Sequence, residues 1–247
     1  MKKSLTILLS LLLTATGAWA LEPFFDAGIN YPANEGPRGV CAGDFDGDGI
    51  DDLAVSNQYS GDVSILISNG DGTYQPPVNY LAGAYAQSVS AADLDADGDK
   101  DLAVSSYGDG VAILLNNGDG TFAPMVTYTA GLAPRWMCVA DLDGDGDFDL
   151  ATANVDSDDM SILLNNGDAT FAPAVHYPVG ADPFHIEAAD LDHDNDYDLI
   201  VSNAYSNDVS ILLNNGDATY QAAVNYTTGI SPRAVSCADF NLCLLYT

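Results

Sequence analysis

Short apolar stretches, separated by polar turn residues, recur along the chain and contain many β-branched and aromatic side chains. Such stretches are typical of strands, and no segment shows a sustained helical period. Within one period the pattern predicts four strands: Val40-Cys41-Ala42 (with counterparts at Val89 and Ile186), Leu53 to Ser56, Val63 to Ile67, and Tyr74 to Tyr80. The chain is therefore expected to be all-β.

The same text repeats with a period of about 49 residues, which is the signature of a repeat architecture. Matching segments begin at Asp44, Asp93, Asp141, Asp190 and Asp239. Between them DVSILISNGDGTY, GVAILLNNGDGTF, DMSILLNNGDATF and DVSILLNNGDATY begin at Asp62, Gly110, Asp159 and Asp208. The Asn-Gly-Asp-Gly element is a strong hairpin signal, because Asn, Asp and Gly tolerate positive φ.

Four short strands in one period match the length of a single propeller blade. A lone blade cannot bury both faces, so the blades must stack on one another. We expect a β-propeller with blades at approximately 36–80, 81–128, 129–177 and 178–226, and a partial fifth at 227–247. A linear β-solenoid or an open row of sheets is the alternative. The stretch from Phe24 to Tyr31 resembles one more fourth strand, which favours a propeller because it could complete the last blade.

The charge of the chain is strongly one-sided: 36 acidic residues stand against six Lys and Arg, for a formal net charge of −30. Such a chain has too little positive charge to neutralise phosphates, so nucleic acid and anionic membrane surfaces are excluded as partners. The composition favours cations instead. Abundant Val, Ile, Leu and aromatic residues indicate a packed core and argue against disorder.

Residues 1–20 have the pattern of a secretory signal peptide. A basic start at Lys2 and Lys3 precedes a mostly apolar run from Leu5 to Leu13, and Ala18-Trp19-Ala20 supplies the small-residue cleavage pattern. The run is too short to span a bilayer, and no second candidate follows. We expect no membrane insertion. The mature chain is then 21–247, secreted to the extracellular space or the periplasm.

Four cysteines in an exported chain raise the question of disulfides. Cys41 and Cys138 occupy the same place in two different repeats, each three residues before an aspartate loop. Equivalent places in separate repeats lie far apart, so we expect these two residues to be unpaired, small strand residues.

Each complete repeat carries an aspartate-rich loop of nine residues. The odd positions 1, 3, 5, 7 and 9 of the four loops are the candidate metal ligands: Asp44, Asp46, Asp48, Ile50 and Asp52; Asp93, Asp95, Asp97, Asp99 and Asp101; Asp141, Asp143, Asp145, Asp147 and Asp149; Asp190, Asp192, Asp194, Asp196 and Asp198. Position 7 is expected to offer its backbone carbonyl and the other positions their carboxylates. Position 6 holds Gly or Asn195, as a sharp turn requires.

This spacing predicts calcium, about four ions in all. Carboxylates at positions 1, 3 and 5 can surround one hard cation, and Ca²⁺ takes six to eight oxygen ligands. Mg²⁺ prefers a smaller, water-rich octahedral shell. The loops differ from helix-loop-helix calcium sites, because position 12 is Val55 or its equivalent, where those sites have a bidentate Glu. A set of solvated acidic turns is the alternative.

The chain resembles the FG-GAP or VCBS repeat family, which is related to the calcium-bearing blades of integrin α-subunit propellers. The resemblance rests on the Asp-x-Asp-x-Asp-Gly-x-x-Asp loops, the strand at Asp52 to Val55 and the hairpin at Asn117 to Phe122, and it covers Phe24 to Phe240. It implies a seven-bladed ring with calcium loops on one face. It also implies a role in adhesion or glycan recognition, or as an accessory module of a larger secreted enzyme.

The chain departs from that family pattern in two ways. Only four complete copies of the repeat are present, and the fifth breaks after Asn241 into Leu242-Cys243-Leu244-Leu245-Tyr246-Thr247. A truncated or frame-shifted gene product, or self-association that completes the ring, explains both. We therefore expect an incomplete ring.

Other recurring residues are weaker candidates for function. Arg38, Arg135 and Arg233 each stand six residues before a loop aspartate. They could grip an anionic sugar or a carboxylate of a partner, but an ion pair with the neighbouring blade is the preferred interpretation. Another series is expected to pack between blades: Tyr31, Tyr80, Tyr128, Tyr177 and Tyr226.

The sequence predicts a binding protein and no enzyme. His176, His185 and His193 do not recur at one repeat position, and no Cys or Ser stands beside a His as nucleophilic catalysis requires. We expect a secreted, non-catalytic, calcium-binding scaffold for cell adhesion, with an extracellular protein or glycan as its partner. An accessory domain or fragment of a secreted polysaccharide-active enzyme is the alternative.

Overall fold

The computed structural model describes residues 29–238. The chain divides into two compact units, Met1–Tyr31 and Pro32–Thr247, and every described strand lies in the second. The expected signal peptide and the last residues of the fifth repeat lie outside the described residues, as does most of the expected extra strand. Residues 29–31 are not in a strand. No helix in the described part of the chain is long and apolar enough to cross a membrane.

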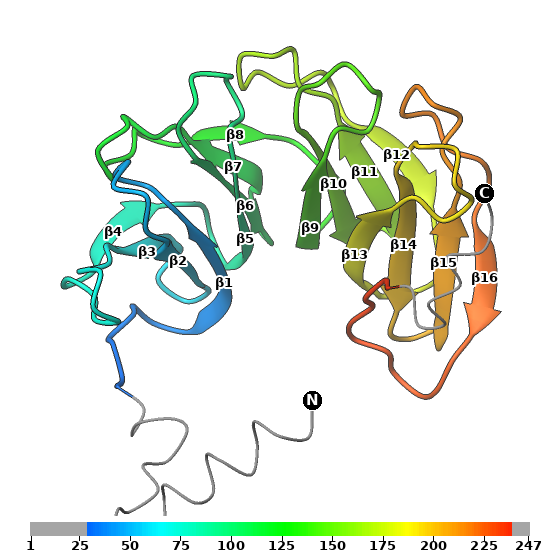
Figure 1. Ribbon diagram of the computed structural model, residues 1–247. Helices are drawn as coiled ribbons and strands as arrows, with labels where there is room; N and C mark the ends of the chain where they lie inside the picture. Colours follow the sequence, from blue (N-terminus) through cyan, green and yellow to red (C-terminus); the bar gives the residue numbers. More distant parts are fainter. Residues whose placement is uncertain (1–28, 239–247) are drawn as a thin grey trace, which may run out of the picture. The chain divides into compact units, whose positions relative to one another are not determined.

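The described residues form four sheets of four antiparallel strands each, and every sheet follows the chain order of its strands (Figure 1). The strands are β1 (Pro37–Gly43), β2 (Asp52–Asn57), β3 (Asp62–Leu66), β4 (Val78–Leu81), β5 (Ala86–Ala92), β6 (Asp101–Ser106), β7 (Gly110–Leu114), β8 (Val126–Tyr128), β9 (Pro134–Ala140), β10 (Asp149–Asn154), β11 (Asp159–Leu163), β12 (Val175–Pro178), β13 (Pro183–Ala189), β14 (Asp198–Asn203), β15 (Asp208–Leu212) and β16 (Val224–Thr227). The prediction of an all-β chain built from four-stranded blades is confirmed.

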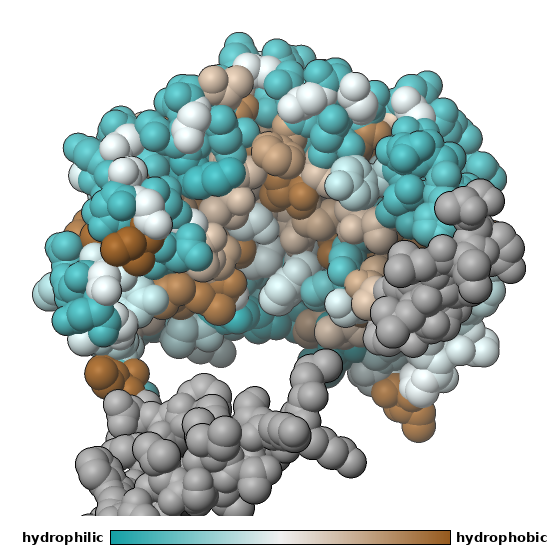
Figure 2. All heavy atoms as spheres, viewed as in Figure 1, coloured by the Kyte–Doolittle hydropathy of each residue, from teal (hydrophilic) through white to brown (hydrophobic). Residues whose placement is uncertain are grey.

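The four blades follow one another in an arc and are not closed into a ring, as expected for an incomplete propeller (Figure 1). The first strand of each blade lies on the inner side of the arc, where β1 packs beside β5, β5 beside β9 and β9 beside β13. Figure 2 shows hydrophilic residues over the outer loops and hydrophobic residues gathered towards the inner side. The two central strands of the second and third blades are almost entirely buried, whereas their fourth strands are mostly exposed.

Hydrophobic cores lie between successive blades. One core joins the first two blades through Val63, Leu102 and Phe122, and equivalent cores join the second to the third and the third to the fourth. The second and third blades therefore bury both faces against their neighbours, and the first and fourth blades bury one face each.

Three members of the tyrosine series pack between blades, as the sequence predicts. Tyr80 meets Phe122 of the next blade edge to face at 5.5 Å. Tyr128 meets Phe171 at 5.1 Å, and Tyr177 meets Tyr220 at 5.5 Å. Such pairs contribute about 0.5–1.5 kcal/mol beyond their buried area. Tyr226, in the last described blade, has no such ring partner there and is 55% exposed.

The fourth strand is shorter than the sequence predicts. Tyr74 forms an isolated bridge with Ser68 outside the strand, and β4 begins at Val78. In the first three repeats proline in this stretch lacks the N–H that a ladder needs. The fourth repeat has Ala222 there and still breaks at the same place, so proline is not required for the break.

The described cysteines, Cys41, Cys138 and Cys237, are free thiols. Burial raises the pKa of Cys41 and of Cys138 to about 12. Both side chains pack against inter-blade cores, so they serve as small apolar residues of the inner strands.

Candidate metal centre

Each aspartate loop connects the first strand of a blade to the second, so all four loops lie at the same end of their blades. The hairpin between the third and fourth strands lies at that end too, because the strands of a blade alternate in direction. The repeat therefore brings an acidic loop and a glycine-rich hairpin together in every blade.

The aspartate at position 1 holds the loop in its turn. Asp44 accepts the backbone N–H of Gly47 with Oδ1 and that of Gly49 with Oδ2, both at 2.8 Å. In the third loop Asp141 accepts the same bonds from Gly144 at 2.8 Å and Gly146 at 3.1 Å. A single carboxylate thus satisfies two backbone donors and leaves lone pairs on both oxygens.

Two residues in each loop have positive φ. The expected turn at position 6 is present, with φ of 86° at Gly49 and 76° at Asn195. Position 4 is also left-handed, which sequence reasoning missed. The φ values at Gly47, Ala96, Gly144 and His193 are 76°, 61°, 78° and 66°. Only the glycines at Gly47 and Gly144 signalled this second turn in the sequence.

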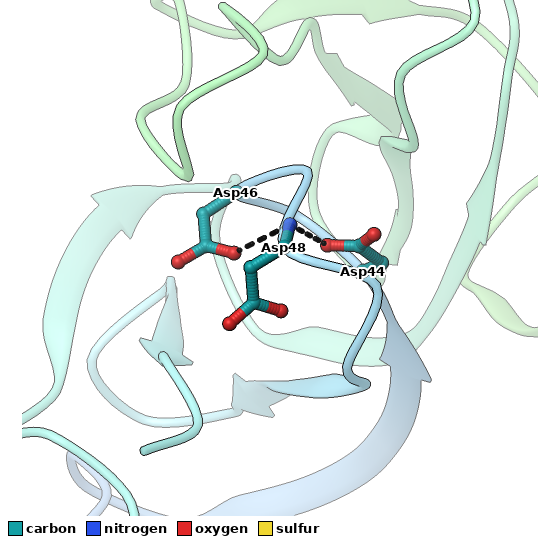
Figure 3. A group of neighbouring side chains, drawn as sticks. All are labelled: Asp44, Asp46 and Asp48. Atoms are coloured by element: carbon teal, nitrogen blue, oxygen red, sulfur yellow. Dashed lines mark hydrogen bonds between the residues drawn. The ribbon is translucent and has the colours of Figure 1, made fainter. Parts of the chain in front are cut away.

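The aspartates at positions 3 and 5 each use one oxygen on the loop backbone. Asp46 Oδ1 accepts the N–H of Asp48 at 3.3 Å, and Asp48 Oδ1 accepts the N–H of Ile50 at 2.8 Å. Figure 3 shows the three side chains projecting from one tight loop, with the amide of Asp48 between the carboxylates of Asp44 and Asp46. The hydrogen bonds fix the directions of the carboxylates before any ion binds.

Each loop brings three carboxylates together, with one oxygen from each lying within 4.8 Å of the others. The four groups are Asp44, Asp46 and Asp48; Asp93, Asp95 and Asp101; Asp141, Asp143 and Asp149; Asp190, Asp192 and Asp194. Calcium binds oxygen at 2.3–2.6 Å, so two of its ligands lie at most about 5 Å apart. The donor chemistry and the spacing fit Ca²⁺.

An orphaned oxygen in the second loop also fits a cation. Asp93 Oδ1 is buried and has no hydrogen-bond partner, whereas Oδ1 of Asp44 and of Asp141 each accept a loop N–H. A buried, unpaired carboxylate oxygen is costly, and the group needs a partner. Asp95 and Asp101 place their own oxygens beside it, so the natural partner is a shared metal ion.

The loops carry negative charge without a basic partner. Within residues 29–238 the only ion pair joins His176 to Asp159, away from the loops. Burial and then the charge of Asp97 raise the pKa of Asp95. Burial also raises the pKa of Asp143, and the charge of Asp145 adds to it. A cation would relieve this repulsion.

The aspartate at position 9 has a second role that the sequence did not reveal. Asp52, Asp101, Asp149 and Asp198 are almost completely buried. Asp149 Oδ2 accepts the N–H of Leu142 at 2.9 Å and Oδ1 accepts that of Asn165 at 2.8 Å. This carboxylate therefore ties the loop to the end of the third strand. Position 9 joins the carboxylate group in the second and third loops; in the first and fourth loops position 5 takes that place.

Position 7 turns its side chain towards the hairpin. A Cβ at Gly167 would lie 2.6 Å from Asp147 Oδ2, and one at Gly216 would lie 2.7 Å from Asp196 Oδ2. At the first loop, Ile50 lies against Gly70 in the same way. These side chains are outside the carboxylate groups, so the contribution expected of Ile50, Asp99, Asp147 and Asp196 remains that of the backbone carbonyl.

Arg38, Arg135 and Arg233 were expected to form ion pairs with the neighbouring blade, and the structure shows other contacts. Within the described residues no arginine forms an ion pair, so the prediction of an ion pair with the neighbouring blade is wrong. Arg135 instead stacks on Phe184, with its guanidinium carbon 3.8 Å from the ring centroid, and Arg233 lies over the same ring at 5.0 Å. Phe184 stands at the equivalent repeat position, where the sequence suggested no contact.

His185, next to Phe184, gives a testable pH dependence. Its ring lies 4.9 Å from Trp136, and burial lowers its pKa, with Glu187 acting in the opposite direction. The unfolded chain therefore binds a proton at His185 more readily than the folded chain, and the free energy of unfolding rises with pH through this group. We expect the His185→Gln variant to show a smaller increase in melting temperature than the wild type between about pH 5.5 and 7.5. An identical increase in both proteins would contradict this assignment.

Comparisons with known proteins agree with the repeat. A family model for the FG-GAP-like repeat matches residues 44–104, 93–152 and 141–201. No curated protein sequence matches the chain. Among solved structures, an Agrocybe aegerita lectin that recognises non-reducing terminal N-acetylglucosamine is similar at 24% identity and a TM-score of 0.53, over 77% of this chain and 52% of that one.

A second similar structure is BBS1N in complex with ARL6DN, at 16% identity and a TM-score of 0.55, over 81% of this chain and 59% of the other. The chain thus spans little more than half the length of these two proteins. Their likeness supports the blade fold. The family matches together cover residues 44–201, which include all four aspartate loops, and the chain belongs to the FG-GAP-like repeat family.

Proposed function

We propose that this protein is a secreted or periplasmic, non-catalytic scaffold whose four aspartate loops bind calcium and hold the blades in a form that binds an extracellular protein or glycan. The observation that carries the calcium proposal is the second loop. There the buried, unpaired Oδ1 of Asp93 lies in one group with the carboxylates of Asp95 and Asp101. Calcium supplies positive charge and six to eight coordination positions to such a group.

The chain's own residues prepare the site. Backbone N–H groups direct the carboxylates, and the buried aspartate at position 9 joins the loop to the following strands. The pattern of residues 1–20 supports export, and extracellular calcium concentrations suit weak sites of this type. The fold similarity to an N-acetylglucosamine-recognising lectin supports a role in binding glycans.

The number of bound ions tests the calcium proposal. Equilibrium dialysis of the mature chain in calcium, followed by metal analysis, is expected to give about four ions per chain, one for each carboxylate group. The double variant Asp93→Asn/Asp95→Asn should lose one ion, because its loop keeps too little charge.

A matched control removes the same charge elsewhere. Asp119 and Asp168 are exposed hairpin aspartates held by Thr121 and Thr170, and the Asp119→Asn/Asp168→Asn variant should bind as much calcium as the wild type. Absence of bound calcium in the wild type, or an equal loss in the control, would contradict the proposal.

A further inference from the structure

A pocket of about 410 Å³ opens at the end of the blades away from the aspartate loops, where the innermost strands begin. Its lining comes from the first three blades and consists of Arg38, Gln58, Tyr85, Gln87, Tyr107 and Arg135. Its volume lies in the range of sites for small molecules, about 300–1,000 Å³. The family assignment and the metal loops account for none of these residues.

Three lining residues occupy one repeat position. Arg38, Gln87 and Arg135 each stand six residues before the first aspartate of a loop. Stacking of the innermost strands therefore places equivalent side chains of consecutive blades beside one another. Phe184, the next member of the series, stacks with Arg135. Arg233, the last member, lies over the same Phe184 ring.

The positive charge of the protein is concentrated here. Beyond residue 20 the chain has four Lys and Arg residues: Lys100 and the three arginines of this series, Arg38, Arg135 and Arg233. Burial lowers the pKa of Arg135, and the charge of Arg38 lowers it further. Within residues 29–238 no carboxylate lies at ion-pair distance from an arginine, and the charge of Asp182 only partly offsets the cluster at Arg135.

The two arginines of the pocket are held in place. The Arg135 guanidinium lies over the ring of Phe184, and the backbone carbonyl of Arg135 accepts a hydrogen bond from Ser105 Oγ at 3.0 Å. Its Nε is buried and lacks a hydrogen-bond partner. Arg38 Nη1 donates to Gln58 Oε1 at 3.1 Å, which leaves its other donors free. A guanidinium with unused donors fits a planar carboxylate.

The remaining walls suit a sugar ring. Tyr85 and Tyr107 are 53% and 39% exposed, so their rings present apolar surface to the pocket. Gln87 Nε2 donates to the Tyr85 carbonyl at 2.8 Å, and the Tyr107 hydroxyl donates to Asp156. The bond to Asp156 positions the Tyr107 ring, and two glutamine side chains supply amides that can pair with hydroxyl groups.

We propose that this pocket binds an acidic saccharide, with the carboxylate of a hexuronic acid unit between Arg38 and Arg135 and the sugar ring against Tyr85 or Tyr107. The inference deepens the proposed function by naming the ligand class of the scaffold. An acidic peptide shares the carboxylate, but a polyacidic chain is repelled by the net charge of −30 and has no use for the aromatic walls. A saccharide with a single carboxylate uses every wall of the pocket.

The test is isothermal titration calorimetry of the mature, calcium-loaded protein with cellobiouronic acid. We expect saturable binding that weakens in high salt, because the pairing is electrostatic. Cellobiose, the neutral match, should bind at least tenfold more weakly. Arg38→Gln should also lose at least tenfold in affinity with an unchanged melting temperature, because Arg38 is exposed and remote from the cores.

Two further variants separate the pocket from the rest of the surface. Tyr107→Ala should weaken binding at least tenfold, whereas Tyr205→Ala, in the corresponding turn of the fourth blade and 80% exposed, should bind as the wild type does. Equal affinity for cellobiose, no binding by the wild type, or tighter binding of triglutamate than of the saccharide would overturn the assignment. A failed titration with about four bound calcium ions leaves the calcium scaffold intact, so the two proposals fail separately.

Discussion

Calcium at a hundred times the dissociation constant of the loops is expected to raise the free energy of unfolding by about 2.7 kcal/mol per loop. Four independent loops would then add about 11 kcal/mol, comparable with the whole stability of an ordinary domain. For a chain of this size, such a gain corresponds to a rise in melting temperature of roughly 20 °C or more. The measurement is thermal unfolding in millimolar calcium and in EDTA.

The control for this experiment concerns ionic strength. A protein of net charge −30 gains stability from any salt, because screening weakens its internal repulsion. The EDTA sample therefore needs NaCl to the same ionic strength, and a parallel sample needs magnesium. A comparable rise in NaCl or in magnesium would show that the loops act as acidic turns without a calcium site.

The calcium effect should also depend on pH with a definite sign. Burial raises the pKa of Asp101 and of Asp149 from 3.8 to about 6. Because the folded-state pKa is the higher one, protonation favours the metal-free fold, and its free energy of unfolding falls as pH rises through this interval. Calcium requires the ionised carboxylates, so its stabilising effect should be larger at pH 7.5 than at pH 5.

Replacement of Asp149 by alanine is expected to destabilise the protein by about 2–6 kcal/mol, because it leaves two buried backbone N–H groups unsatisfied at about 1–3 kcal/mol each. Asp149 is 1% exposed, and its oxygens accept the N–H groups of Leu142 and Asn165. The loss should appear in EDTA as well as in calcium, because these hydrogen bonds do not involve the metal. Chemical denaturation under both conditions measures it.

Asp143, from the same loop, is the matched comparison. It accepts only one loop N–H, from Asp145 at 3.2 Å, and it is partly exposed. Asp143→Ala should therefore lose stability mainly in calcium and change little in EDTA, where removal of one negative charge relieves repulsion. If Asp149→Ala were also neutral in EDTA, position 9 would be a metal ligand alone.

The strands, the repeat and the acidic loops could be predicted because each depends on residues that are close together in the sequence. β-Branched runs, Asn-Gly-Asp-Gly turns and the spacing of aspartates recur within a few residues of one another. The left-handed residue at position 4 was missed because Ala96 and His193 are poor signals for positive φ. The loop, and not the residue type, sets the backbone there.

Contacts between distant residues were beyond sequence reasoning. Asp149, at the start of β10, accepts the N–H of Asn165, which follows the neighbouring strand β11. Which residue donates this bond depends on the register of the two strands. Arg135 was expected to pair with an acidic neighbour, but the adjacent blade presents Phe184 at the equivalent position. The pocket likewise depends on three blades whose side chains meet only after stacking.

The asparagines that begin the last three hairpins each form a hydrogen bond with the aspartate loop of the preceding blade. Asn116 Nδ2 donates to the carbonyl of Phe45 in the preceding loop at 2.9 Å, and Asn165 and Asn214 do the same to Leu94 and Leu142 at 2.8 Å. Each loop is thus braced by the blade that follows it. Leu191, in the fourth loop, is 37% exposed, whereas Phe45 is fully buried. Loss of one of these asparagines is therefore expected to destabilise the loop of the preceding blade, whereas the fourth loop has no such donor within residues 29–238.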